Sequence, residues 1–198
     1  MMKKYSIIYA DPPWQYRDKA LSGERGVEFK YKTMTPEQIR RLPVGTICAD
    51  DCVLFLWATM PQLPIALKVM KSWGFTYKTV AFTWVKRTKK NWKLAWGMGN
   101  WTRANPEIVL LGTRGKPKRV GKGVHSVVES AVRKHSQKPD EVRDRIVELM
   151  GDVPRVELFA RERVESWDSW GNEVECDFEF PTGKERITSV LSQMREGK

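Results

Sequence analysis

Blocks of apolar residues alternate with polar stretches along this chain and predict a succession of strands and helices. Residues 6–10 (SIIYA) and 52–58 (CVLFLWA) are continuous apolar runs, typical of strands that are covered on both faces. Residues 77–85 (YKTVAFTWV) are rich in β-branched and aromatic side chains, which favours a third strand. We expect two further strands, at residues 107–111 and 156–159.

Cap residues and apolar spacing predict the helices. Thr35 and Gln38 have the spacing of a capping box, with Pro36 in the first helical position, so a helix begins here. Gly74 and Gly151 are placed as helix ends. The other predicted helices lie at residues 61–73, 139–150 and about 187–194.

This alternation predicts an α/β fold with a mainly parallel sheet and helices on both faces. Ligands of such sheets bind beyond the carboxyl ends of the strands, where Asp11 and Arg161 follow predicted strands. We expect one domain over residues 1–175, with internal basic loops at about 86–103 and 113–125. Residues 176–198 are expected to form a tail with a short helix.

Composition narrows the class of protein. The chain has 198 residues, 41% of them hydrophobic, and no apolar run approaches the length of a membrane span or a signal sequence. Its three cysteines (Cys48, Cys52, Cys176) and two histidines form no CxxC pair and no zinc-ligand set. We therefore expect a cytoplasmic protein with free thiols, no bound metal and no membrane partner.

The net charge of +11 is concentrated in one part of the chain. Residues 86–122 contain a single acid, Glu107, and eleven cations: Lys86, Arg87, Lys89, Lys90, Lys93, Arg103, Arg114, Lys116, Lys118, Arg119 and Lys122. Trp92, Trp96 and Trp101 are interleaved with them and are either loop anchors or stacking surfaces for bases. Cations beside aromatic rings favour a nucleic-acid partner, although a solvated face would have the same charge pattern.

The stretch YADPPWQY at the end of the first strand carries the candidate chemistry. Two successive prolines cannot donate to a sheet, so the strand stops at Asp11. The Asp11 carboxylate and the Pro12 carbonyl are acceptors, Pro13 has no N–H to repel a donor, and Trp14 and Tyr16 offer rings. Such an edge suits an exocyclic amino group, whose developing positive charge the two acceptors would stabilise during attack on an electrophile.

Eight segments, in this order, carry a resemblance to a known family: YADPPW, YKTMTPEQI, LFLWAT, WGF…FTWVK, GNWTRANPEIVLLG, HSQKPDEVRDRIVEL, VELFAR and WDSWGNE. The chain resembles, over about residues 5–174, the adenine-N(6) methyltransferases that include the eukaryotic mRNA methylase catalytic subunit and its bacterial and phage relatives. The resemblance implies S-adenosyl-L-methionine as methyl donor and a Rossmann-like methyltransferase sheet with a permuted motif order.

The resemblance also implies roles for individual residues. Asp11, Pro12, Pro13 and Trp14 would be catalytic. The cofactor would be held by Asp11, Lys138, Arg161, Asn172 and Glu173. This agrees with the residue chemistry, since an amino-acid tail needs a cation such as Lys138 and a ribose diol suits an amide beside a carboxylate.

We expect nucleic acid to bind Tyr16, Tyr31, Lys86, Lys89, Lys90, Trp96, Arg103, Lys116, Lys118 and Arg119. Structural alternatives remain for several positions: Trp57 and Trp73 are expected in the core, and His135 either orders the cofactor loop or lies on the surface. In the family's mRNA enzyme an acid upstream of the first strand reads the cofactor adenine, and we expect no counterpart of it here. After FAR, eukaryotic members often carry His-Asn, where this chain has Glu162, Arg163 and Val164.

The leading hypothesis is a bacterial or phage type of methyltransferase acting on the adenine amino group in DNA. RNA adenine, a cytosine amino group and a non-catalytic nucleic-acid-binding subunit are the alternatives, and a homodimer is left open. The intact DPPW sequence favours an enzyme, because a chain that only binds would not need the acceptor pair.

Overall fold

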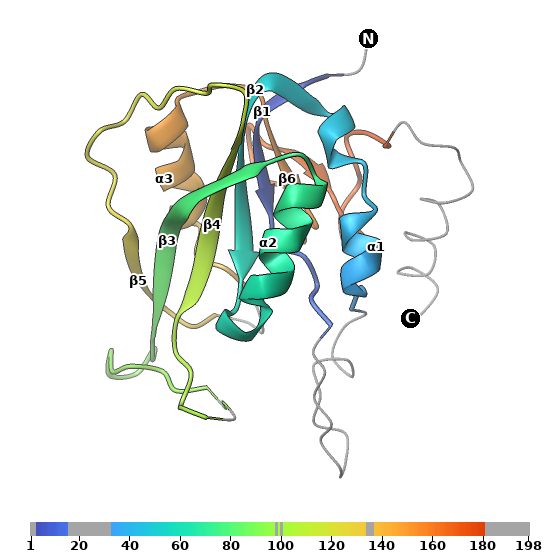
Figure 1. Ribbon diagram of the computed structural model, residues 1–198. Coiled ribbons are helices and arrows are strands. Elements are labelled where there is room, and N and C mark those ends of the chain that lie inside the picture. Colours follow the sequence, from blue (N-terminus) through green and yellow to red (C-terminus); the bar gives the residue numbers. More distant parts are fainter. Residues whose placement is uncertain (1–2, 16–32, 98, 100, 134–136, 181–198) are drawn as a thin grey trace.

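The computed structural model describes residues 3–15, 33–97, 99, 101–133 and 137–180 (Figure 1). Tyr16, Tyr31, His135 and the expected helix at 187–194 lie outside these described residues.

Within the described residues, seven strands form one sheet in the order β5-β3-β4-β2-β1-β6-β7. Four of the neighbouring pairs are parallel (β1 with β2, β1 with β6, β6 with β7, β3 with β5), and β4 is antiparallel to both of its neighbours. The strands are β1 Tyr5–Ala10, β2 Cys48–Ala58, β3 Thr76–Arg87, β4 Glu107–Arg114, β5 Val127–Ala131, β6 Arg155–Leu158 and β7 Asp168–Trp170. The mainly parallel α/β prediction is confirmed, with β4 as the reversed strand.

Helices cover both faces of the sheet (Figure 1). The helices α1 (Pro36–Arg40) and α2 (Leu63–Ser72) pack on one face and α3 (Glu141–Met150) packs on the other. Two short 3-10 turns, η2 (Val44–Thr46) and η3 (Met60–Gln62), flank β2.

The continuous apolar runs are explained by this double coverage. In β1, Ile8 packs in the core beneath α1 and α2, whereas Ile7 and Tyr9 pack in the core beneath α3. In β2, Leu54 and Phe55 divide between the two cores in the same way. Since successive strand residues point to opposite faces, both sets must be apolar.

Local signals mark the helix ends as predicted. Thr35 accepts a hydrogen bond from the Gln38 backbone N–H, and the Gln38 side chain accepts one from the Thr35 N–H, which completes the capping box. Gly151 ends α3 with a φ of 85°, a left-handed conformation that glycine adopts without strain. Trp57 and Trp73 are 1% and 2% exposed and are confirmed as core residues.

Two strands were not predicted. β5 and β7 have five and three residues, occupy the two ends of the sheet and contain polar positions. Such short mixed segments have too few apolar positions to show a strand period.

The reversed β4 determines what gathers at each edge of the sheet. We call the edge where β1, β2 and β3 end the carboxyl edge, and the edge where β1 and β2 begin the amino edge. Ile108, near the start of β4, pairs with Ala58 at the carboxyl edge, whereas Arg114 pairs with Cys52 toward the amino edge. Glu107 therefore joins the carboxyl edge although it begins its strand.

The described residues after 175 continue to pack on the sheet. Phe180 is 5% exposed and its ring meets Trp170 edge-on at a centroid distance of 5.1 Å. Phe178 contacts Tyr5 at 5.8 Å. No helix in the described part of the chain has the length and apolarity that a membrane crossing needs.

Candidate active site

The DPPW segment leaves the sheet at the carboxyl edge. β1 ends at Ala10, and the Asp11 N–H reaches the Leu158 carbonyl at 3.4 Å as the last contact with β6. The Pro12 carbonyl accepts a hydrogen bond from the Trp14 N–H at 2.8 Å. One lone pair of this carbonyl is thus occupied, and the second is available to a further donor.

Trp14 packs into the protein. It is 5% exposed, and its indole N–H donates to the Trp57 carbonyl at 3.2 Å. The Pro13 carbonyl accepts from the Met34 N–H at 2.9 Å, which fixes the other side of the segment. Trp14 therefore makes the edge rigid, and its role as a stacking surface stays a prediction.

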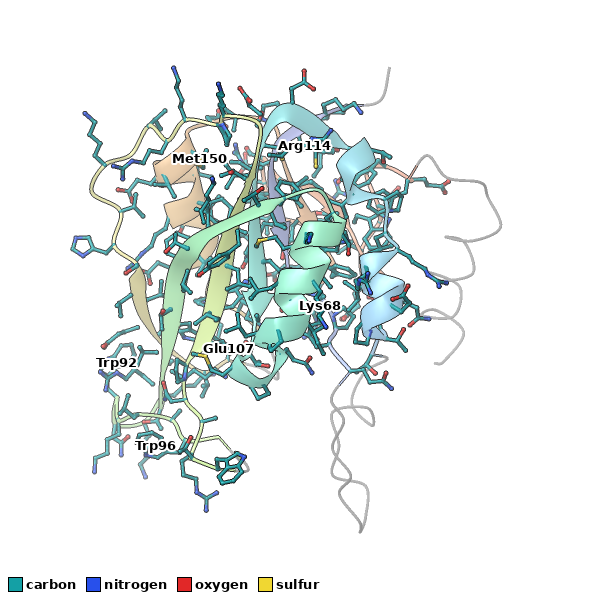
Figure 2. The ribbon with its side chains drawn as sticks, viewed as in Figure 1. Lys68, Trp92, Trp96, Glu107, Arg114 and Met150 are labelled. Atoms are coloured by element: carbon teal, nitrogen blue, oxygen red, sulfur yellow. The ribbon has the colours of Figure 1, made fainter. Side chains whose placement is uncertain are left out.

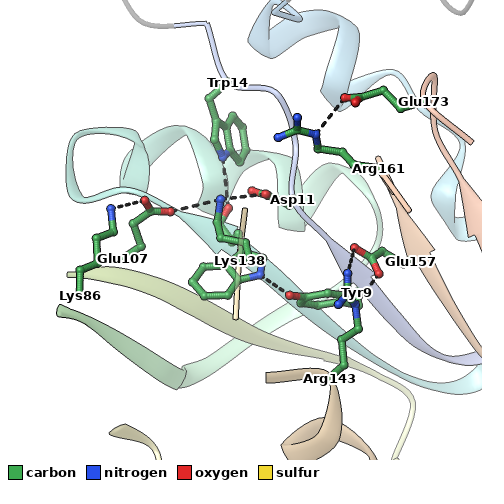
Figure 3. Close-up of polar contacts among 11 residues, drawn as sticks. Tyr9, Asp11, Trp14, Lys86, Glu107, Lys138, Arg143, Glu157, Arg161 and Glu173 are labelled. Atoms are coloured by element: carbon green, nitrogen blue, oxygen red, sulfur yellow. Dashed lines mark hydrogen bonds and ion pairs between the residues drawn. The ribbon is translucent and has the colours of Figure 1, made fainter. Parts of the chain in front are cut away.

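An alternating chain of charges lies beside this segment (Figure 3). Lys138 Nζ lies 2.8 Å from Asp11 Oδ2 and 3.3 Å from Glu107 Oε2. Glu107 Oε1 in turn lies 2.5 Å from Lys86 Nζ. Lys138 also lies over the Trp57 ring, 5.3 Å from its centroid. The network orients the Asp11 carboxylate and the Lys138 ammonium on one side of the carboxyl edge.

Burial and pairing shift the ionisation of these groups. Burial raises the pKa of Asp11, Glu107 raises it further, and Lys138 opposes both. Burial alone would lower the pKa of Lys138, but the carboxylates of Asp11 and Glu107 outweigh it, and the pKa rises. Burial would also raise the pKa of Glu107, but Lys138 and Lys86 outweigh it, and the pKa falls. Lys138 and Glu107 are therefore charged at neutral pH.

A cleft of about 310 Å³ opens next to Asp11 and Lys138. Phe159, Arg161 and Glu173 line another part of it. Arg161 Nε donates to Glu173 Oε1 at 2.9 Å, and both side chains are nearly half exposed. The cleft thus combines several cations, carboxylates and an aromatic ring.

Gly171 explains how the FAR and WGNE segments come together. A Cβ on Gly171 would lie 2.2 Å from the Ala160 carbonyl oxygen, and the Ala160 N–H donates to the Trp170 carbonyl at 3.0 Å. The two backbones can approach this closely because glycine has no side chain. This contact brings Arg161 and Glu173 to the same cleft.

Four residues at the site were not singled out as functional from the sequence. Glu107 bridges two lysines, and its signal was its position as the one acid among eleven cations. Arg143 and Glu157 line the cleft as a bidentate ion pair, in which Arg143 Nε and Nη2 donate to the two Glu157 carboxylate oxygens at 2.8 and 3.2 Å. Phe159 has a φ of 64°, a left-handed conformation that bulky residues rarely adopt and that no sequence pattern indicates.

The other predicted residues fall in three places. Asn172 is half-buried and does not line the cleft, although its neighbour Glu173 does. Lys89, Lys90, Trp96 and Arg103 lie between β3 and β4, beyond the carboxyl edge. Lys116, Lys118 and Arg119 lie after β4, at the amino edge, away from Asp11. The structure therefore places the residues between β3 and β4, but not those after β4, at the edge of the sheet where the cleft opens.

No group of three or more metal-type side chains gathers in the part of the chain that the structure describes. The carboxylates at the cleft are matched by lysine and arginine instead.

A mixed sheet with helices on both faces and a charged cleft beyond its parallel strands defines a Rossmann-like α/β domain. The chain belongs to the MT-A70 family, whose model matches residues 5–173. It is 35% identical to the type II methyltransferase M.MunI of a Mycoplasma species over 199 residues, which cover 91% of this chain and 82% of that protein.

More distant similarity extends to eukaryotic proteins. The human N(6)-adenosine-methyltransferase catalytic subunit METTL3 is 28% identical over 179 residues, 88% of this chain and 29% of METTL3. The Arabidopsis thaliana N(6)-adenosine-methyltransferase MT-A70-like is 30% identical over 175 residues, 86% of this chain and 24% of that protein.

Proposed function

We propose that this protein transfers a methyl group from S-adenosyl-L-methionine to the exocyclic amino group of adenine in DNA. The observation that carries the proposal is the Asp11 carboxylate, held at the end of β1 by Lys138 and opening on a cleft of about 310 Å³. Membership of the MT-A70 family and similarity to a type II methyltransferase support the same reaction class.

The residues of the cleft fit the cofactor chemically. Its amino-acid tail is a zwitterion, for which Lys138 supplies a cation and Asp11 a carboxylate. Its ribose hydroxyls are donors, for which Glu173 supplies a carboxylate at the other side of the cleft. A volume of about 310 Å³ lies within the range of small-molecule sites. When bound there, the cofactor would supply an electrophilic methyl group.

The chain's own residues would then position and activate the amine. Asp11 accepts a hydrogen bond from one amino hydrogen, and the free lone pair of the Pro12 carbonyl accepts the other. Both acceptors stabilise the positive charge that develops on nitrogen during the transfer. Because Trp14 and Met34 fix the backbone on both sides of Pro13, these acceptors need no reorganisation.

DNA is the polymer we propose because the chain covers 82% of the type II methyltransferase and 29% of METTL3. RNA is the second candidate, supported by the N(6)-adenosine-methyltransferases among the relatives. The acceptor pair at Asp11 and Pro12 favours an active enzyme over a subunit that only binds.

The test incubates the purified protein with methyl-labelled S-adenosyl-L-methionine and with DNA or RNA oligomers, followed by digestion to nucleosides. Label in deoxyadenosine is the expected result. Label only in adenosine from RNA would show that the substrate is RNA and not DNA. Label in cytidine nucleosides would show that the target base is cytosine and not adenine. The absence of label from every nucleoside, with oligomer binding retained, would overturn the enzymatic proposal.

A further inference from the structure

The protein contains nine tryptophans, and their exposure divides them sharply. Six are buried, with exposures between 0% and 6%: Trp14, Trp57, Trp73, Trp84, Trp167 and Trp170. Trp92, Trp96 and Trp101 are 53%, 64% and 99% exposed, and all three lie in residues 88–106, which we call the β3–β4 hairpin. Exposed aromatic side chains gathered in one segment indicate an interaction surface.

The base of the hairpin is held by specific contacts. Asn105 is 7% exposed, and its amide donates to the carbonyls of Lys86 and Ala95 at 2.9 and 2.6 Å. Its side-chain oxygen accepts from the Lys86 N–H at 3.1 Å. Arg87 forms a two-pronged ion pair with Glu129 on β5 at 2.9 to 3.1 Å. The outgoing and returning limbs are thus tied together, so the cost of ordering the base of the hairpin is already met before binding.

The charge of the hairpin favours a polyanion. Lys89, Lys90 and Lys93 are exposed, and none of them has an ion-pair partner within the described residues. No acid occurs in the hairpin. Lysine is depleted at protein–protein interfaces, whereas lysines beside stacking rings are typical of surfaces that bind single-stranded nucleic acid.

The hairpin also adjoins the candidate active site (Figure 2). Figure 2 shows Trp92 and Trp96 beyond the end of the sheet where Glu107 lies. Glu107 ion-pairs with Lys86 at the base of the hairpin and with Lys138 at the cleft. A strand bound along the hairpin would therefore lead to the cleft.

We propose that the β3–β4 hairpin is a stacking surface for unpaired bases, on which Trp96 and Trp101 hold the nucleic acid next to the cleft. The proposal rests on the proposed function for its substrate class. Tryptophan rings stack on the flat faces of bases, which are covered by neighbours in a duplex and exposed in an unpaired strand. The adenine amino group must likewise leave a duplex to reach an enzyme pocket.

The test measures binding of a fluorescent oligo(dT) of about 20 nucleotides without cofactor. Thymine has no exocyclic amine, so this probe reports the hairpin independently of methyl transfer. Changing Trp96→Ala and Trp101→Ala together is expected to weaken oligo(dT) binding by about 30-fold or more, as expected for the loss of two stacked bases. Binding of the same oligo(dT) paired with oligo(dA) as a duplex is expected to change less than about threefold, because only unpaired bases can stack on the tryptophan rings.

Tyr77→Ala is the matched control, since Tyr77 is an exposed aromatic (44%) near the start of β3, at the other end of the same strand. It should leave oligo(dT) binding unchanged. The double tryptophan variant should also keep the wild-type salt slope, because it removes no charge. A lower slope would assign the loss to phosphate contacts and overturn stacking.

Unchanged oligo(dT) binding by the double variant, or an equal loss for the duplex, would overturn the inference. If the double variant lost binding to anionic lipid vesicles but kept oligo(dT) binding, the hairpin would be a membrane-binding surface instead. If the protein transferred no methyl group but its oligo(dT) binding depended on the two tryptophans, the proposed function would be overturned. The stacking role of the hairpin would be supported.

Discussion

Two stretches of the chain are almost equally basic. Residues 86–106 contain six Lys or Arg and residues 114–125 contain five, and neither stretch contains an acid. The first comprises the end of β3 and the β3–β4 hairpin, beyond the carboxyl edge. The second, which we call the strap, leaves β4 at the amino edge and runs past α3 to β5 (Figure 1).

The contacts of the two stretches differ more than their charge. The hairpin carries three exposed tryptophans and adjoins the ion pairs of the cleft. The strap packs on the end of α3, where the Val120 and Gly121 N–H groups donate to the Leu149 carbonyl. The Lys116 N–H donates to Asp51 Oδ1 at 2.7 Å.

Distance separates the two regions electrostatically. The eight residues of β4 place its ends roughly 23 Å apart at about 3.3 Å per residue. That is more than twice the screening length of about 8 Å at physiological salt. Similar charge counts therefore do not imply an equal part in binding at the cleft.

The largest expected difference between the edges is catalytic. Asp11→Ala should lower the rate of methyl transfer by about 10³-fold, the effect of removing a preorganised group that stabilises transition-state charge. Cofactor affinity should fall less than about tenfold, since Lys138 and Glu173 remain. Labelled-methyl transfer and equilibrium binding measure the two effects.

Asp51→Ala at the amino edge is the control and should transfer methyl groups at the wild-type rate. A near-normal rate for Asp11→Ala would refute the role assigned to that carboxylate.

Glu107→Gln tests the ion pairs that link hairpin and cleft. It should lower the free energy of unfolding at neutral pH by about 3 kcal/mol, as when one member of a buried pair is removed. The pKa of Glu107 is lowered in the fold from 4.5, so its stabilisation is full above pH 4.5 and is lost as the pH falls through the folded-state value. The difference in unfolding free energy between wild type and Glu107→Gln should therefore shrink at low pH. Urea unfolding near pH 7 and near pH 3 measures this difference.

Glu129→Gln, which breaks the more exposed pair with Arg87, should cost about 0.5 kcal/mol or less. A constant stability gap between wild type and Glu107→Gln at both pH values would contradict an ionic role for Glu107.

Gly171→Ala tests the close approach behind the cleft. The new methyl group would meet the Ala160 carbonyl at 2.2 Å, and we expect a loss of about 2 kcal/mol, or roughly 6 °C in Tm. Gly123→Ala in the strap is the matched control, since nothing lies within 4 Å of its added Cβ. Equal melting temperatures for the two variants would show that the 160–171 contact is not tight.

The smallest expected effect concerns the phosphate contacts of the exposed lysines. Lys89→Ala with Lys90→Ala should reduce the salt slope of oligo(dT) binding by about 1.4, the value for two lost phosphate contacts on a single strand. Lys116→Ala with Lys118→Ala should leave the slope unchanged. Equal reductions by both pairs would mean that nucleic acid contacts both edges, and would remove the distinction drawn between hairpin and strap.

Much of the fold was predictable because its signals are local. The capping box at Thr35, the glycine after α3 and the doubly buried runs of β1 and β2 each depend on a few adjacent residues. β5 and β7 were missed because short end strands depend on pairing with neighbours, which no local pattern records.

The site divides in the same way. Asp11, Lys138, Arg161 and Glu173 lie in recognisable segments, and the structure places all four at one cleft. Glu107 had one sequence signal, its isolation among eleven cations, but the roles of Glu107 and Glu157 come from Lys138 and Arg143, partners that only the fold brings close.

Residue order alone predicts the α/β class, the end of the first strand at a carboxylate and two prolines, and the excess of positive charge. Backbone restrictions and residue chemistry act locally, so they can be predicted from neighbouring residues alone. Which of the two basic segments lies at the edge where the cleft opens depends on strand pairing across the sheet. The reversal of β4 sends the hairpin to the carboxyl edge and the strap to the amino edge, and strand direction is set by long-range pairing rather than by the residues of β4 themselves.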